Sequence, residues 1–179
     1  MKLSTLSILT GLVMALPQIY GLLNPTGFAA AARKFPRNTS IGYVLIGIAT
    51  VWFLYYLKQE SVADFASMKP VLFVLFAAVG LGTCVFVHDF LPVRGLAVVL
   101  MLLAKLLVDS ARWVDTEWRL VLTTLAYIWV VAGMWFTISP WRLRDLLNWA
   151  TTSEQRIRVG SGLRLAFGLF IALLGFTVF

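Results

Sequence analysis

The sequence is poor in charged residues and in the side chains that most often bind metals. Only 13% of its 179 residues are charged, whereas soluble domains average about a quarter. It contains one cysteine, Cys84, and one histidine, His88. A lone cysteine cannot form a disulfide within the chain, and these two residues cannot supply a structural zinc site or an iron–sulfur cluster. We therefore expect neither a metal nor another cofactor.

Catalytic motifs are lacking as well. The segment 160–162, GSG, has two glycines around a serine, but it lacks the intervening residue of a serine-nucleophile turn and follows no predicted strand. The sequence contains no phosphate-binding loop, no dinucleotide fingerprint, no HExxH and no CxxC. We therefore predict that the protein is not an enzyme.

Apolar residues are abundant instead: they make up 60% of the sequence, and its mean hydropathy is +0.88. A chain of this length has too little interior to bury so much apolar surface, so the excess must face lipid. Six apolar segments approach the roughly 20 residues that cross the hydrocarbon core of a membrane. The sequence predicts an all-α, polytopic transmembrane bundle that forms one domain over 1–179. Its spans are expected at 3–23, 40–57, 70–87, 93–113, 118–138 and 157–179.

The first span also has features of a signal peptide, because it begins with Met and Lys and is apolar. No small-x-small cleavage site follows it, however, and the apolar stretch is long. We therefore expect a retained transmembrane helix.

The segment 139–156 predicts a short amphipathic helix, at about 140–150, that lies in the lipid headgroup layer. Ser139 can cap this helix and Pro140 suits its first turn. Apolar Trp and Leu side chains are then interspersed with charged Arg and Asp side chains, as in helices that lie on a membrane surface. A plain linker is the alternative, and another short helix is predicted within 24–39. The residues expected at the lipid interface are Trp141, Arg142, Arg144 and Trp149.

Fifteen Lys and Arg against eight Asp and Glu give a net charge of +7. The basic residues lie between apolar spans and form no continuous stripe, so we expect no nucleic-acid partner. Cytoplasmic loops are enriched in Lys and Arg. One side of the predicted topology holds Arg33, Lys34, Arg37, Arg94, Arg142, Arg144, Arg156 and Arg158. The other side holds Lys2, Lys58, Lys69, Arg112 and Arg119, diluted by Glu60, Asp64, Asp115 and Glu117. Both termini are therefore expected outside the cytoplasm.

A weak internal repeat relates the two ends of the chain. The segments 24–47 and 139–168 each open with a polar residue and a proline, continue through a basic stretch and enter the next span through a glycine. The first span then corresponds to the fifth and the second to the sixth, in the same direction, so the repeat would be parallel. The third and fourth spans would form a central hairpin between the two repeats.

The second repeat carries a pattern of Pro–aromatic–Arg, a basic amphipathic stretch, an acidic turn, and Arg and Gly before the last span. The residues of this pattern are Pro140, Trp141, Arg142, Glu154, Arg156, Arg158 and Gly160. Over about 140–176 the sequence thereby resembles a family of small, two-span, uncharacterised bacterial inner-membrane proteins. The resemblance covers about a fifth of the chain. It implies a bacterial cytoplasmic membrane and no particular activity.

Three charges share one face of the fourth span. At 100° per residue, Asp109 lies about 40° from Lys105, and Arg112 lies about 20° to the other side. A charge at the centre of the bilayer costs about 2.5–3.5 kcal/mol on insertion scales, and pairing of neighbours on a helix reduces this cost. We favour a structural ion pair with a lysine that snorkels toward the headgroups. The alternative is a proton or ion site that faces the interior of the bundle.

Small residues recur every four positions in two spans. They are Ser7, Gly11 and Ala15 in the first, and Gly160, Gly168 and Ala172, with Arg164 between them, in the last. A third, shorter stripe consists of Ala78 and Gly82. Such stripes let helices approach closely, either within one bundle or between subunits.

These features favour a non-enzymatic, accessory or structural subunit of a membrane. It would pack against membrane lipids and against other membrane subunits or a second copy of itself. The alternative is a small transporter or channel whose polar path is lined by Lys105 and Asp109.

Overall fold

The structure is a computed structural model that describes residues 2–59 and 68–179, so Glu60 and Asp64 lie outside the described residues. Every regular element in these two ranges is a helix. Six helices are long and apolar enough to cross a membrane, which confirms the predicted all-α bundle of six spans. They are α1 (Leu3–Leu23), α3 (Thr39–Gln59), α4 (Lys69–Phe86), α5 (Leu91–Ala111), α6 (Arg119–Ile138) and α8 (Glu154–Thr177).

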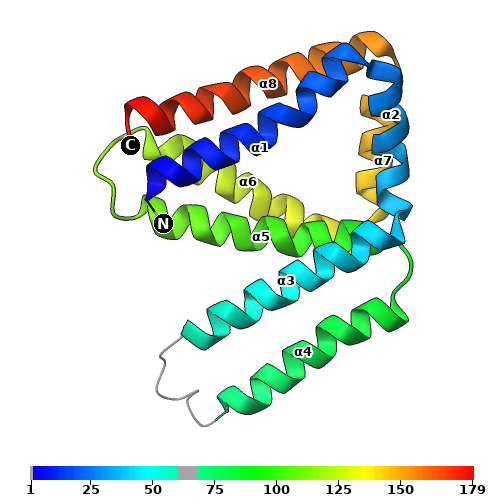
Figure 1. The fold of residues 1–179 in the computed structure, drawn as a ribbon, viewed down its shortest axis with the longest axis vertical. Coiled ribbons are helices and arrows are strands. Elements are labelled where there is room, and N and C mark those ends of the chain that lie inside the picture. Colours follow the sequence, from blue (N-terminus) through cyan, green and yellow to red (C-terminus); the bar gives the residue numbers. More distant parts are fainter. Residues whose placement is uncertain (1, 60–67) are drawn as a thin grey trace.

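Two short helices, α2 (Pro25–Lys34) and α7 (Trp141–Ala150), run across the ends of the long helices (Figure 1). The link between α4 and α5 lies at this same end of the bundle, and both termini lie at the opposite end (Figure 1). Asn24 begins α2, because its side chain accepts a hydrogen bond from the Gly27 amide at 2.9 Å. A 3₁₀ turn, η1 (Phe35–Arg37), connects α2 to α3.

The start of α7 differs from the prediction. Ser139 does not cap α7: its amide donates to the Trp135 carbonyl and closes α6, and Pro140 is the residue that precedes the first turn of α7. The reason is that the cap position of α7 is occupied by Pro140, which has helical backbone angles and no side-chain oxygen that could accept a hydrogen bond.

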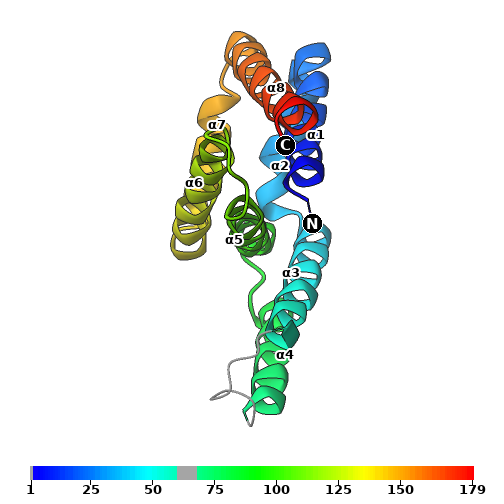
Figure 2. The same cartoon turned by 90° about the vertical axis from the view of Figure 1, so that its left-hand side faces the viewer.

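The helices α1 and α8, at opposite ends of the sequence, form an antiparallel pair along one side of the molecule (Figures 1 and 2). At the end of the bundle that holds the termini, this pair packs against α5 and α6. The core there consists of apolar residues from all four helices: Leu3, Leu6, Ala104, Leu107, Ala111, Leu122, Leu125, Ala126 and Ile171.

The central helix α5 separates the two halves of the chain. It packs against α6 on one side and α3 on the other. Close approach to α3 depends on two glycines: a Cβ at Gly42 would lie 2.9 Å from the Leu91 Cβ, and a Cβ at Gly95 would lie 2.7 Å from the Leu45 Cβ. Small residues at such crossings let two backbones come together in lipid.

The prediction that the third and fourth spans form a central hairpin is wrong, because α4 and α5 do not pack on each other along their length. Although α4 and α5 follow each other in the sequence, α4 packs mainly on α3, and α3 in turn packs on α5. The physical reason is the position of Gly80, which faces the Thr50 side chain of α3 and lets these two helices meet. The helices α3 and α4 thus form an arm that extends from the four-helix part of the molecule (Figure 1).

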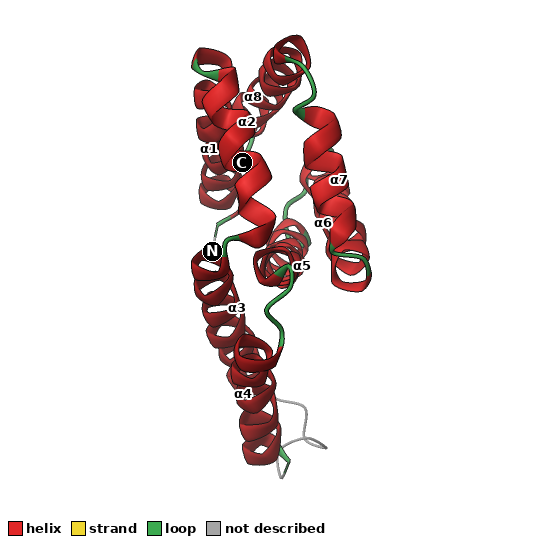
Figure 3. Cartoon of the chain, turned by 90° about the vertical axis from the view of Figure 1, so that its right-hand side faces the viewer, coloured by secondary structure: helices red, strands yellow, loops and turns green. Residues whose placement is uncertain are grey.

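The segments α1–α2–α3 and α6–α7–α8 have the same order of elements: a long helix, a short crossing helix and a second long helix (Figure 3). Their partners differ, however. The first helix of one segment, α1, packs directly on α8, whereas α5 lies between α6 and α3. The similarity therefore extends to the element order and not to the packing.

Candidate functional site

The two crossing helices are joined by one arginine. Arg33, in the last turn of α2, donates from Nε to the Thr151 hydroxyl at 2.9 Å and from Nη2 to the Thr151 carbonyl at 2.7 Å. Thr151 ends α7, so the guanidinium satisfies a carbonyl that helical hydrogen bonding leaves free. The positive charge also suits the negative end of the helix dipole. Arg33 was counted in the sequence only as a loop charge, because its partner is 118 residues away.

The residues predicted for the lipid interface all belong to α7. Trp141 and Trp149 are exposed, with 46% and 64% of their surface accessible, whereas Leu143 is buried at 8% and anchors the helix. Arg144 pairs with Asp145 at 2.8 Å and its guanidinium lies 5.8 Å from the centre of the Phe90 ring. Exposed tryptophans beside a basic face are typical of a helix in the headgroup layer.

Arg142 lies on the side of α7 that faces α6. Together with Asp145 and Trp149 it lines a cavity of about 440 Å³ whose other wall is formed by Trp135 and Phe136 of α6. This cavity is mostly apolar, and Arg142 shares its wall with the acidic residue Asp145.

A second cavity, of about 510 Å³, lies on the opposite side of α7, where the chain turns into α8. Two arginines line it, Arg156 and Arg164, together with Trp149 at its edge. The Arg156 guanidinium lies 5.4 Å from the centre of the Trp149 ring. We call this space the α7–α8 cavity. Sequence reasoning identified its arginines separately, as a loop charge and as a member of a packing stripe, and did not join them.

On the charged face of α5, the structure brings together Lys105 and Asp109 of the three predicted charges. Lys105 Nζ contacts Asp109 Oδ2 at 2.8 Å, and the Lys105 ammonium lies 5.1 Å from the centre of the Tyr56 ring of α3. Arg112 follows the last turn of α5, and no ion pair joins it to Asp109 within the described ranges. The two paired side chains remain 44% and 52% exposed. They therefore lie on an outer face of the α3–α5 junction, near the end of the bundle that holds the termini.

Five of the six predicted seam residues meet in the α1–α8 interface. A Cβ at Gly11 would lie 2.5 Å from the Ala172 amide nitrogen, and one at Gly168 would lie 3.0 Å from the Ala15 amide nitrogen. Ser7 Oγ, which is fully buried, donates to the Ile171 carbonyl at 2.6 Å. The stripes therefore face each other within this chain.

Gly160 is the exception, and its place in the seam is taken by Ser161. A Cβ at Gly160 would meet nothing within 4 Å, whereas Ser161 is buried and contacts Gly21 of α1. Steps of four residues rotate by about 40° each, so Gly160 lies about 80° from Gly168, whereas Ser161 lies only about 20° from it. A seven-residue step keeps the same face.

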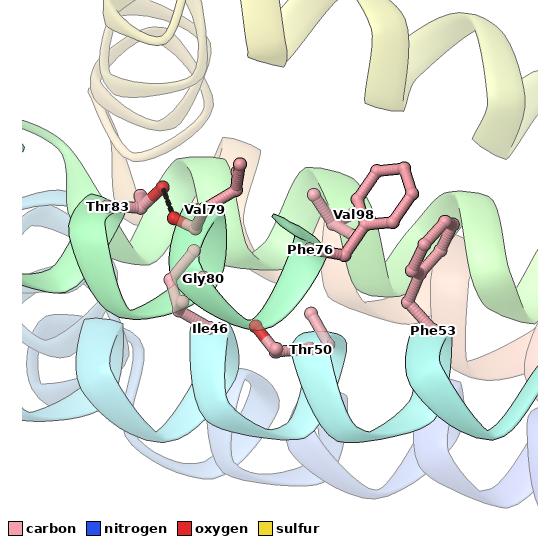
Figure 4. A pocket seen from close by; sticks show the side chains of 9 residues that line it. Ile46, Thr50, Phe53, Phe76, Val79, Gly80, Thr83 and Val98 are labelled. Carbon is pink, nitrogen blue, oxygen red and sulfur yellow. Dashed lines mark hydrogen bonds between the residues drawn. The ribbon is translucent and has the colours of Figure 1, made fainter. Parts of the chain in front are cut away.

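The third stripe does not form a helix contact. Ala78 is exposed, and the nearest atom to a Cβ at Gly82 would be Phe86 of the same helix at 3.9 Å. The α4 face that meets α3 instead contains Phe76, Val79, Gly80 and Thr83. They line an apolar cavity of about 250 Å³ with Thr50 and Phe53 of α3, and the Thr83 hydroxyl is bonded to the Val79 carbonyl of its own helix (Figure 4).

Metal and cofactor sites were not expected from the sequence. Among residues 2–59 and 68–179, no three His, Cys, Asp or Glu side chains gather in a group that could hold a metal ion. Cys84 lies near the end of α4, and His88 lies in the link that follows it.

Comparison of the chain with protein-family models, with curated proteins and with solved structures finds no match. The resemblance of 140–176 to two-span bacterial inner-membrane proteins therefore stays a prediction.

Proposed function

We propose that this multi-pass membrane protein is a non-catalytic accessory or structural subunit that packs against lipid and against the helices of a partner. Its location would be the cytoplasmic membrane of a bacterium. The crossing helices α2 and α7 would lie in the cytoplasmic headgroup layer. The reason is that the basic residues on the Arg-rich side of the predicted topology, from Arg33 to Arg158, gather at that end of the bundle. Both termini would then lie on the other side.

One observation carries the proposal: α4 has no buried residue from Lys69 to Phe86. Leu81, Val74 and Phe86 are exposed at 70%, 71% and 84%. Transmembrane helices associate through close packing and hydrogen bonds, since lipid tails are as apolar as leucine. A helix that packs mainly on one neighbour among the described residues, and whose outer face carries the small residues Ala78 and Gly82, is suited to contact another subunit.

Site-specific crosslinking in intact cells tests this proposal. A photoreactive residue would replace Leu81 on α4 and, as the matched control, Val13 on α1, which is exposed to the same degree at 69%. We expect discrete protein adducts at position 81 and only lipid adducts at position 13. Lipid adducts alone at both positions would contradict a subunit role for α4.

Transport is the second candidate, and the contact of Lys105 with Asp109 and Tyr56 is the observation that favours it. Charged residues inside membrane spans often mark ion pathways, and the Tyr56 hydroxyl is buried without a hydrogen-bond partner among the described residues. The half-exposed position of the ion pair favours the subunit role. Proteoliposomes that contain a pH-sensitive dye and carry a potassium diffusion potential discriminate between the two. Proton influx above that of empty vesicles, abolished by Lys105→Met, would establish transport.

A further inference from the structure

The α7–α8 cavity combines open space with the positive charge of two arginines, Arg156 and Arg164. Neither Arg156 nor Arg164 has a carboxylate within 4 Å in the part of the chain that the structure describes. Among the described residues that line the cavity, none is acidic. Two neighbouring arginines already have partners, since Arg144 pairs with Asp145 and Arg33 binds Thr151.

We propose that the α7–α8 cavity binds the head group of an anionic phospholipid, with its phosphate between Arg156 and Arg164. This inference rests on the membrane location in the proposed function but not on a protein partner.

Arg156 is held in a suitable orientation by Trp149. A guanidinium that lies over an aromatic ring uses its face for this contact, so the N–H groups at its edge remain available. Arginine presents these donors as a planar fork that matches two phosphate oxygens. Tryptophan also favours the membrane–water interface, so the Trp149–Arg156 pair lies at the depth where lipid phosphates are found.

Arg164 supplies the second charge from deeper in the membrane. It lies eight residues after Arg156, about 12 Å farther along α8. A long basic side chain at this depth extends toward the headgroups while its methylene groups stay in the apolar layer. Both arginines line the same cavity, so an anion between them would be contacted from the interface and from below.

The rest of the cavity wall favours a lipid over a free anion. Phe28 of α2, Leu147 of α7, and Val159 and Leu163 of α8 provide an apolar surface beside the two arginines. Gly160 also lines the cavity, between Val159 and Leu163 in the sequence, and open space surrounds the position that its Cβ would occupy. A phosphodiester that binds the arginines would thus continue into an apolar groove suited to an acyl chain.

Native mass spectrometry of the full chain in mild detergent tests the site. Phosphatidylglycerol is titrated as the anionic probe, phosphatidylcholine as the zwitterionic one and inorganic phosphate as the head-group chemistry alone. For the wild type we expect one tightly retained phosphatidylglycerol, bound at least tenfold more strongly than phosphatidylcholine. Inorganic phosphate at millimolar concentration should not displace it.

Two pairs of variants separate the site from general effects. Arg156→Gln removes a cavity charge, and Arg158→Gln removes the same charge from the same turn outside the cavity. Gly160→Leu places a leucine side chain at the cavity wall, and Gly162→Leu adds the same side chain at a position that does not line the cavity. At both positions a Cβ would meet nothing within 4 Å. We expect the first member of each pair to weaken phosphatidylglycerol binding at least tenfold, and the second to change it less than twofold.

Equal losses for Arg156→Gln and Arg158→Gln would overturn the proposal, since they would indicate only a diffuse electrostatic attraction. Unchanged binding in Gly160→Leu would overturn it as well. Displacement of the lipid by inorganic phosphate would assign the site to a free anion. None of these results depends on the crosslinks of α4, so failure of the lipid site and failure of the subunit role are distinguishable.

Discussion

The α1–α8 pair and the α3–α4 arm are both antiparallel helix pairs, but their interfaces are built from different residues. In α1–α8 the contact is made by backbone and small side chains, with Gly11 and Gly168 each facing the main chain of the other helix. In the arm, Phe53 and Phe76 meet with their ring centres 4.6 Å apart, and a cavity of about 250 Å³ remains beside them.

This difference follows from the solvent. In water, the large aromatic residues of the arm would provide the stronger association, because they bury more apolar area. In lipid that driving force is absent, and the pair with the closer fit and a buried hydrogen bond is the stable one. The α1–α8 pair therefore anchors the fold, while the arm is the part whose packing another helix can complete.

The largest effect is expected from Gly11→Ala. The new methyl group would lie 2.5 Å from the Ala172 nitrogen, and since this neighbour is backbone, the two helices must separate. We expect a loss of about 3 kcal/mol in the free energy of unfolding, at the upper end of overpacking costs. Denaturation by dodecyl sulfate in mixed micelles, followed by circular dichroism, measures it. Gly47→Ala, where nothing lies within 4 Å, is the control and should not destabilise. Equal stability of Gly11→Ala and Gly47→Ala would show that the α1–α8 interface accepts an added methyl group as easily as an open position does, which contradicts its closer fit.

A smaller effect is expected from the same substitution in the arm. A methyl group at Gly80 would meet the Thr50 side chain, and not the backbone of α3. Rotation of Thr50 relieves part of this clash, so we expect Gly80→Ala to cost about 1 kcal/mol in the same unfolding assay. Gly82→Ala on the outer face should be neutral or slightly stabilising, because alanine is the better helix former. A loss at Gly80 as large as that at Gly11 would show that both interfaces are equally tight.

The smallest effect is expected from removal of the ion pair on α5. Because both side chains are about half exposed, the pair contributes little, and the double variant Lys105→Met/Asp109→Leu should change stability by less than about 1 kcal/mol. Lys105→Met alone leaves Asp109 without its partner and should be the less stable of the two variants. The same denaturation series provides the comparison. A marked loss in the double variant would instead indicate a buried role for the pair.

The span boundaries could be predicted from the sequence because each boundary is a local property. A run of apolar residues must end where the hydrocarbon ends, so the predicted span 3–23 coincides with α1, and 118–138 differs from α6 by one residue. The Lys105–Asp109 contact was predictable for the same reason, since helical geometry alone brings residues four apart together.

Helix partners could not be predicted in this way. The stripe Ser7, Gly11 and Ala15 identifies a face suited to close packing, but any other small-residue face would fit it. The position of Gly160 was misassigned because a four-residue step was followed over three turns, where its rotation carries it off the interface. The Arg33–Thr151 contact joins two segments whose spacing in the sequence contains no pattern.

The hydrogen bond from Ser7 to the Ile171 carbonyl joins residues that are 164 positions apart. During synthesis, α1 is made long before its partner α8. Throughout that interval its glycine face is open to the small-residue faces of other nascent proteins. The α1–α8 contact thus forms only after the helices between them have been made, and truncation within α8 would leave α1 without the neighbour that its face is shaped to meet.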